Sequence, residues 1–175
     1  MAPFTSFRVT RKEDRGYTSV VTFPLAFVLG IVAGLRSMTP PAVAAWAAHF
    51  GWIDLDGTPL AFLESAPARY ILLAAMLGEL VSDKLPFTPA RTNIGPFTAR
   101  IVSGALSGAA LTVGLGGSLA AGAVAGALGA VLGALGGYRA RTGLVRALGV
   151  PDFPIALAED VIAVGTALLV AATGG

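Results

Sequence analysis

The chain has 175 residues, of which 55% are hydrophobic and only 13% are charged, and its mean hydropathy is +0.77. Soluble domains carry about 25% charged residues, so this composition argues against a soluble protein. No charged residue occurs between Ile101 and Tyr138, and this stretch is long enough for two membrane passes of about 20 residues each. The net charge is only +2, so the basic residues indicate cationic loops at a membrane face, not a nucleic-acid partner.

The residue inventory excludes several kinds of chemistry. There is no cysteine, which excludes disulfides, thiol catalysis and thiolate metal sites. The one histidine, His49, excludes a site built from several histidines of one chain. No hydrolase, phosphate-loop or zinc-protease motif occurs, so we expect no enzyme and no cofactor, and leave open whether a metal binds.

In chain order, we expect a polar cytoplasmic tail over residues 1–16 and a single transmembrane domain over residues 17–175. Spans are predicted at about 18–36, 68–85, 97–114, 118–138 and 154–172. The first lacks a small-residue cleavage site, so it is interpreted as a retained helix and not a signal peptide. Residues 139–150 should form a basic amphipathic connector. The predicted fold is therefore an all-α, polytopic membrane helix bundle of about five spans.

A short apolar segment follows the first span. Met38-Thr39-Pro40-Pro41 ends that span, because proline removes a backbone donor and restricts the preceding residue. Residues 42–52 are apolar but too short to cross a bilayer. We predict a re-entrant or interfacial helix here, with Trp46 and Trp52 at headgroup depth.

The positions of the basic residues predict an orientation. With five spans and a cytoplasmic N-terminus, ten lysines and arginines lie inside and only Arg36 and Arg69 lie outside. This bias follows the positive-inside rule. We therefore expect a multi-pass protein of the cell inner (cytoplasmic) membrane with its C-terminus outside.

Part of the sequence nearly repeats itself. Residues 28–39 recur as residues 131–142 without a gap, and six of the twelve positions are identical. Five spans would place the two copies in opposite directions, which predicts an inverted repeat of spans 1–2 and 4–5, as in many transporters. Chance is the alternative explanation, because Gly, Ala, Val and Leu dominate the chain.

Two predicted spans contain acids. Glu79 and Asp83 are four residues apart and share a helix face, and Glu159 and Asp160 lie in the last span. Ionisable groups in hydrocarbon are costly, so they face a partner or a watery cavity. Two interpretations stay open: static ion pairs with the arginines of the repeat, or a shared polar site that binds a cation, protons or a polar headgroup.

Arg36 and Arg139 occupy equivalent places at the ends of the repeated helices. Each could extend its side chain to the interface, or could contact an anionic group such as a phosphate or carboxylate. Thr39, three residues after Arg36, could add a hydroxyl ligand. In the loop after the second span, Thr92, Asn93 and Thr98 are weaker candidates.

Glycines spaced by four residues recur in the third and fourth spans. They place small residues on one helix face, where two backbones can approach closely. The pattern is compatible with packing inside one chain or with a homo-oligomer interface. Because five short spans leave little room for an internal pathway, we favour a dimer. The residues are Gly104, Gly108, Gly122, Gly126, Gly129, Gly133 and Gly137.

Three motifs together resemble one bacterial membrane-protein family. They are Gly34-Leu35-Arg36-Ser37-Met38-Thr39-Pro40-Pro41, Gly78-Glu79-Leu80-Val81-Ser82-Asp83-Lys84-Leu85-Pro86 and Ala158-Glu159-Asp160. The family is known as a domain of unknown function with small, glycine-rich members, and the resemblance covers about residues 24–172. It implies a class of protein but no mechanism.

A looser similarity concerns residues 79–84, which resemble the Glu-x-Gly-Asp-Lys motif of a cation/proton exchanger family. Here the acids are four apart instead of three, and Ser82 stands where glycine is expected. The second similarity therefore only suggests cation exchange.

These observations predict a small secondary transporter or channel-like protein for a cation, protons or a small polar or anionic solute. Its partners would be the lipid bilayer and that solute, with no nucleic acid. The alternative is a non-transporting structural or assembly module of the membrane. A third possibility is a lipid-modifying enzyme that uses the carboxylates as acid and base.

Overall fold

The structure, a computed structural model, describes residues 14–83 and 93–173, with side chains from residue 21 onward. These residues form helices and contain no strand, which confirms the all-α prediction. Residues 1–13 and 84–92 lie outside the described part, and with them most of the predicted tail, Lys84, Arg91 and Thr92. The elements are α1 (Asp14–Leu35), α2 (Thr39–His49), the 3₁₀ helix η1 (Ala61–Glu64), α3 (Ala66–Ser82), α4 (Ile94–Gly114), α5 (Leu119–Leu148) and α6 (Asp152–Ala172).

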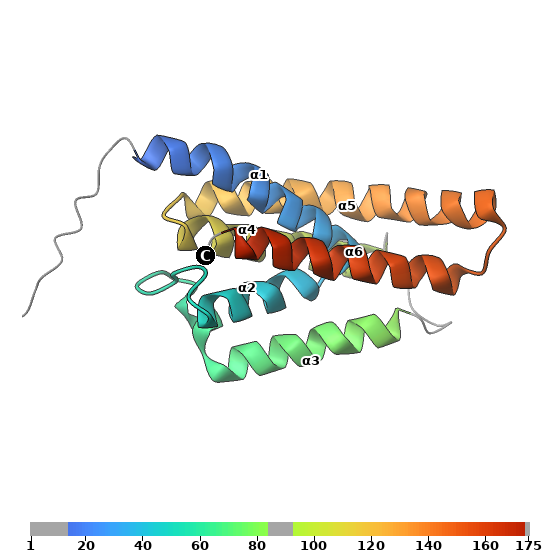
Figure 1. The fold of residues 1–175 in the computed structure, drawn as a ribbon, viewed down its shortest axis with the longest axis horizontal. Helices are drawn as coiled ribbons and strands as arrows, with labels where there is room; N and C mark the ends of the chain where they lie inside the picture. The colour runs from blue at the N-terminus through green and yellow to red at the C-terminus, as the bar shows by residue number, and fades with distance from the viewer. Residues whose placement is uncertain (1–13, 84–92, 174–175) are drawn as a thin grey trace, which may run out of the picture.

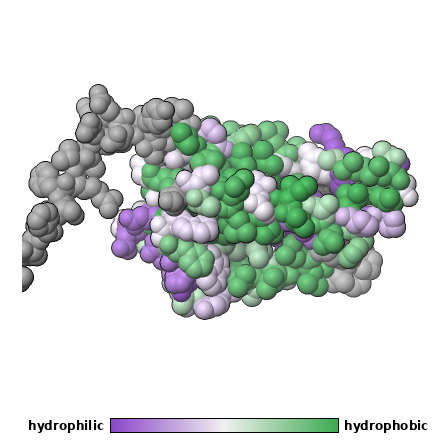
Figure 2. Space-filling view, in the orientation of Figure 1, coloured by the Kyte–Doolittle hydropathy of each residue, from purple (hydrophilic) through white to green (hydrophobic). Residues whose placement is uncertain are grey.

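Three helices, α4, α5 and α6, are long and apolar enough to cross a membrane. They coincide with three of the five predicted spans. The apolar part of α1, Val21–Leu35, is shorter, and α3 has 17 residues. On the face that Figure 2 shows, hydrophobic residues cover the middle and hydrophilic residues gather towards the ends. The chain is therefore a membrane protein.

Local sequence explains where several helices begin and end. The Ser65 and Ser118 side chains accept hydrogen bonds from the backbone N–H groups of Ala68 and Ala121, which caps the starts of α3 and α5. Gly149, at φ +62°, ends α5 in the left-handed conformation that glycine adopts without strain. The earlier glycines of α5, including Gly143, do not adopt this left-handed conformation, and α5 continues as a helix through the region predicted to be a separate connector.

Three helices form a tightly packed centre. The glycines of α1, α4 and α5 lie so close together that a Cβ atom on Gly30 or Gly104 would collide with the backbone of Gly126. Gly108 likewise faces the backbone of Gly122. Small residues allow this approach of helix backbones. The structure thus uses these glycines for packing within one chain, and the expected dimer stays a prediction.

The direction of α2 was not foreseen. The six α-helices alternate in direction along the molecule, so that α1 and α2 form a hairpin (Figure 1). Nearly every residue of α2 is buried, because the helix packs against α1, α3, α4 and α6. An interfacial helix would expose one face, which does not fit this burial, and the re-entrant alternative stays a prediction.

This extra reversal corrects the predicted inverted repeat. Gly30 of α1 faces Gly126 of α5, and Gly34 faces Ala130 and Gly133, so residue numbers rise together and the two helices are parallel. Opposite directions were expected because the five-span scheme did not count α2 as a reversal. The two similar segments are therefore not related by the inversion that we predicted.

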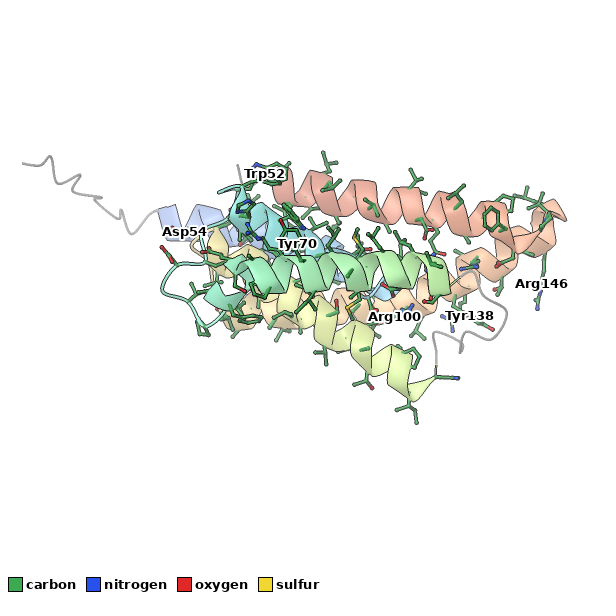
Figure 3. All side chains as sticks on the ribbon, turned by 90° about the horizontal axis from the view of Figure 1, so that it is seen from below. Trp52, Asp54, Tyr70, Arg100, Tyr138 and Arg146 are labelled. Carbon is green, nitrogen blue, oxygen red and sulfur yellow. The ribbon has the colours of Figure 1, made fainter. Side chains whose placement is uncertain are left out.

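The same reversal changes the expected placement of the chain ends. The start of α1 and the end of α6 lie at the same end of the bundle (Figure 1), whereas five spans would put them on opposite faces. Arg146, at the end of α5, lies at the other end of the molecule, far from Trp52 and Asp54 (Figure 3). The start of α1 and the end of α5 thus lie at opposite ends of the bundle, whereas the five-span scheme required them to lie at the same end.

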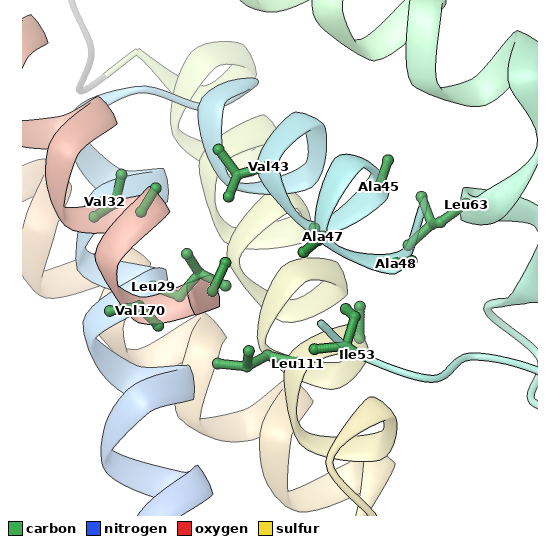
Figure 4. Close-up of a cluster of buried hydrophobic side chains, with 14 of the residues drawn as sticks. Leu29, Val32, Val43, Ala45, Ala47, Ala48, Ile53, Leu63, Leu111 and Val170 are labelled. Carbon is green, nitrogen blue, oxygen red and sulfur yellow. The ribbon is translucent and has the colours of Figure 1, made fainter. Parts of the chain in front are cut away.

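Around the packed centre, α2 and α6 enclose a hydrophobic cluster. It includes Leu29 and Val32 of α1, Val43 of α2, Leu111 of α4 and Val170 of α6 (Figure 4). In contrast, α3 has no fully buried residue and packs mainly on α2 and η1. It is the outermost helix of the bundle.

Candidate functional site

The tip of the α1–α2 hairpin lies inside the bundle. The last helical turn of α1 closes with the Arg36 N–H donating to the Val32 carbonyl (2.7 Å), and Pro40 and Pro41 occupy the first positions of α2, which proline tolerates. Gly34 packs against the middle of α5, and α5 continues about four turns beyond that level. The non-helical segment between α1 and α2, residues 36–38, is therefore surrounded by other helices.

Arg36 occupies this tip with no exposed surface (0%). Its Nη1 donates to Asp83 Oδ2 at the end of α3. Its Nε donates to Asp160 Oδ1 of α6 (2.5 Å), and Nη2 lies against the same oxygen without a directed hydrogen bond. A buried guanidinium needs such partners, because burial of an unpaired charge is very costly. Arg36 thus connects the ends of α1 and α3 to the middle of α6.

Glu79 binds the same tip from α3. One carboxylate oxygen, Oε1, accepts hydrogen bonds from the Ser37 backbone N–H (2.7 Å) and hydroxyl (2.8 Å), and Oε2 accepts from the Met38 N–H (2.7 Å). These donors precede α2, whose N-terminus favours negative charge. The carboxylate therefore supplies the cap that Met38, the N-cap residue, lacks in its own side chain.

Arg100 and Ser103 of α4 complete the cluster. Arg100 Nε donates to the Gly34 carbonyl (3.0 Å), and its Nη2 lies 3.7 Å from Glu79 Oε1 and 4.0 Å from Asp83 Oδ2. The Ser103 hydroxyl donates to the Ser37 carbonyl. Both side chains are buried. We call Arg36, Glu79, Asp83, Arg100 and Asp160 the charge cluster.

Arg100 is not among the predicted site residues, because it is one of the ten basic residues assigned above to the cytoplasmic side. The sequence does contain a pattern that indicates burial of Arg100. Arg100, Ser103 and Ser107 are spaced by three and four residues, so they share the helix face that carries the glycines. An arginine on such a face points into a bundle, and not to the membrane surface.

Glu159 does not join the charge cluster, although its neighbour Asp160 does. It pairs with Arg141 of α5 (3.4 Å), which also binds Asp152 at the start of α6. Glu159 and Arg141 line an apolar pocket of about 230 Å³ between α5 and α6. Successive residues of a helix point about 100° apart, so one acid faces α1 and the other α5.

Three other predicted residues have different outcomes. Arg139 is exposed on α5 and lies in neither group of charges, so the equivalence with Arg36 that the repeat implied does not extend to their surroundings. Thr39 is fully buried next to the cluster, and its hydroxyl has no hydrogen-bond partner. Thr98 lines a groove described below.

The charge cluster therefore brings together four predicted residues: Arg36, Glu79, Asp83 and Asp160. Within the described ranges, no group of three or more His, Cys, Asp and Glu residues is arranged to hold a metal ion. Instead, the carboxylates of α3 and α6 surround the guanidinium groups of α1 and α4.

Comparisons with known proteins place the chain in a family but add no activity. No curated protein and no solved structure matches it. One family, described as a domain of unknown function (DUF4126), matches residues 24–173, which include all the residues of the charge cluster. The chain is thus a membrane protein that belongs to the DUF4126 family.

Proposed function

We propose that the protein is a small secondary transporter that exchanges a cation for protons at the charge cluster. One observation carries the proposal: Arg36, wholly buried at a break between two helices, is held by carboxylates from two further helices, Asp83 of α3 and Asp160 of α6. Ionisable groups at such depth in membrane proteins commonly belong to ion pathways or proton relays.

The position of the cluster supports this role. Transporters often bind ions near the membrane midplane, where discontinuous helices expose helix ends to the ligand. Here α1 ends and α2 begins inside the bundle, and the start of α2 faces Glu79. The break therefore brings backbone donors, carboxylates and guanidinium groups to one point.

The pairing of Arg36 suggests a mechanism. A cation that binds Asp83 or Asp160 takes over contacts that the guanidinium makes in this state, and protonation of either carboxyl weakens the same contacts. Cation binding and proton binding would therefore exclude one another. Because Asp83 and Asp160 belong to different helices, each exchange would also alter how α3 and α6 are held to α1.

The test is proton flux in proteoliposomes that contain the full chain, driven by a gradient of Na⁺, K⁺ or an organic cation. Asp160→Asn should abolish cation-driven proton movement. Asp152→Asn is the matched control, since Asp152 lies on the same helix but pairs with Arg141 at the exposed end; it should retain the flux. Equal flux in the wild type and Asp160→Asn would contradict the proposal.

A static structural module is the second candidate, because every acid of the charge cluster has partners in the structure. It predicts that Asp160→Asn lowers thermal stability while no cation moves protons in the wild type. Flux and thermal stability measured on the same preparations separate the two functions.

A further inference from the structure

We propose that the exchanged cation is the headgroup of a single-chain amphiphile, which reaches the charge cluster sideways from the bilayer between α3 and α4. This inference rests on the proposed function, since it names the chemical class of the cation that the same site would take.

The route is a groove of about 620 Å³ between α3, α4 and the start of α2. Its walls are almost entirely apolar and include Pro41, Leu72, Val102 and Leu106. Viewed from below, the start of α4 diverges from α3 (Figure 3). The groove thus forms where the outermost helix leaves α4 partly uncovered.

The mouth of this groove faces hydrocarbon. Its wall helix α4 is one of the three helices that are long and apolar enough to span a membrane. Val102 and Ile94, which line the groove, are 60% and 86% exposed. Exposed apolar side chains on a membrane-spanning helix contact acyl chains, and a water-filled path would be lined by polar groups. An acyl chain therefore suits the groove better than a hydrated ion does.

The inner wall of the groove contains no member of the charge cluster, but two of its residues contact the cluster or the chain tip beside it. Met38, which donates its N–H to Glu79, and Ser103, which donates its hydroxyl to the Ser37 carbonyl, both line it. On α3, Glu79 follows the lining residue Leu72 by seven positions, so the two share a helix face. An occupant of the groove would thus have an apolar part and an end beside the carboxylates.

The exposure of the cluster indicates the charge of that end. The Glu79 and Asp83 side chains keep 11% and 12% of their surface, whereas Arg100 keeps 5% and Arg36 none. The groups that remain most accessible are therefore the carboxylates. They would attract a positively charged headgroup, and the apolar walls would hold its chain.

The experiment measures proton movement out of proteoliposomes with a trapped pH-sensitive dye. Three probes distinguish the contribution of the alkyl chain from that of the headgroup charge. Dodecyltrimethylammonium has both a long alkyl chain and a positive headgroup. Tetramethylammonium has a similar headgroup without the alkyl chain, and dodecyl phosphate has the alkyl chain with a negative headgroup. The two quaternary ammonium heads have no dissociable proton, so neither can cross the bilayer as a neutral amine does, and protein-free liposomes measure the proton movement that dodecyl phosphate causes by itself. Protein-free liposomes and Asp160→Asn proteoliposomes report leakage.

Two matched variants test the groove itself. Val102→Trp fills it, whereas Val124→Trp adds the same bulk at a valine of α5 that is equally exposed (56%) and lies outside the lining. We expect saturable proton movement with dodecyltrimethylammonium only, lost in Val102→Trp and kept in Val124→Trp. Circular dichroism and gel filtration confirm that both variants fold.

Each other outcome has a distinct meaning. If tetramethylammonium, Na⁺ or K⁺ drives protons as well as dodecyltrimethylammonium does, or if the two tryptophan variants behave alike, the amphiphile inference is wrong while cation exchange stands. If no cation moves protons through the wild-type protein, the proposed function itself fails.

Discussion

At the level of single residues, the buried arginine has the largest expected energetic effect. Replacing Arg36 by methionine would remove the guanidinium that Asp83 and Asp160 share, and breaking a buried ion pair in this way costs about 3–5 kcal/mol. We expect a clearly lower melting temperature in detergent, measured by intrinsic fluorescence.

The repeat supplies the control. Arg139→Met changes the matching arginine, which is exposed and outside both groups of charges, so its effect should stay within about 0.5 kcal/mol. Equal destabilisation by the two substitutions would show that Arg36 is not the centre of the cluster.

A second residue prediction concerns the cap on α2. Glu79→Gln keeps one acceptor oxygen but turns an amide NH₂ towards donors at Ser37 or Met38. An unsatisfied buried donor costs about 1–3 kcal/mol. Hydrogen exchange measured by mass spectrometry should therefore rise at residues 36–42, and unchanged exchange there would contradict the role of Glu79 as a cap.

Sequence reasoning found most of this site because charged residues in apolar helices are expensive. That argument identified Arg36, Glu79, Asp83 and Asp160. It failed for Glu159, since adjacent helical residues point in different directions and sequence alone did not reveal which one faced α1. It failed for Arg100 because proximity to a predicted loop was taken to mean exposure.

At the level of helices, the glycine contacts between α4 and α5 permit a sharp test. A Cβ atom on Gly126 would overlap the backbone of Gly104, so Gly126→Ala must push the helices apart. Overpacking of this kind costs about 1–3 kcal/mol. Gly136→Ala lies on the same helix in open space and should be neutral or slightly stabilising, by up to about 1 kcal/mol. Thermal melting of the two variants compares them, and similar values would contradict the observed packing.

The helix positions were predictable, but the direction of α2 was not. Apolar runs and proline positions located the helices well, and Pro40 and Pro41 correctly indicated a break. However, a helix of 11 residues gives no sign of whether it lies on the surface or folds back. Its burial depends on contacts with α3, α4 and α6, which all follow later in the chain. The sequence of α2 itself does not reveal these contacts.

At the level of the whole molecule, the alternating helices predict a topology that single cysteines can test. The natural chain has no cysteine, so each introduced thiol reports alone. Gly16→Cys, near the start of α1, and Arg146→Cys, near the end of α5, should react with a membrane-impermeant maleimide from opposite sides of sealed vesicles. Asp56→Cys should react from the same side as Gly16→Cys.

The five-span scheme gives the reverse pattern, with positions 16 and 146 together and position 56 opposite. Labelling of positions 16 and 146 from one side would therefore contradict the arrangement in Figure 1. The positive-inside argument failed here because its count of charges depended on the number of reversals, and α2 adds one.

The most direct test measures proton release by the purified protein in weakly buffered detergent. The cations added, one at a time, are Na⁺, K⁺ and dodecyltrimethylammonium. If cation and protons compete for Asp83 and Asp160, the wild type and Asp152→Asn should release protons in a saturable way, and Asp160→Asn should release far fewer. Cation binding without proton release, or release that is unchanged in Asp160→Asn, would contradict exchange at the charge cluster.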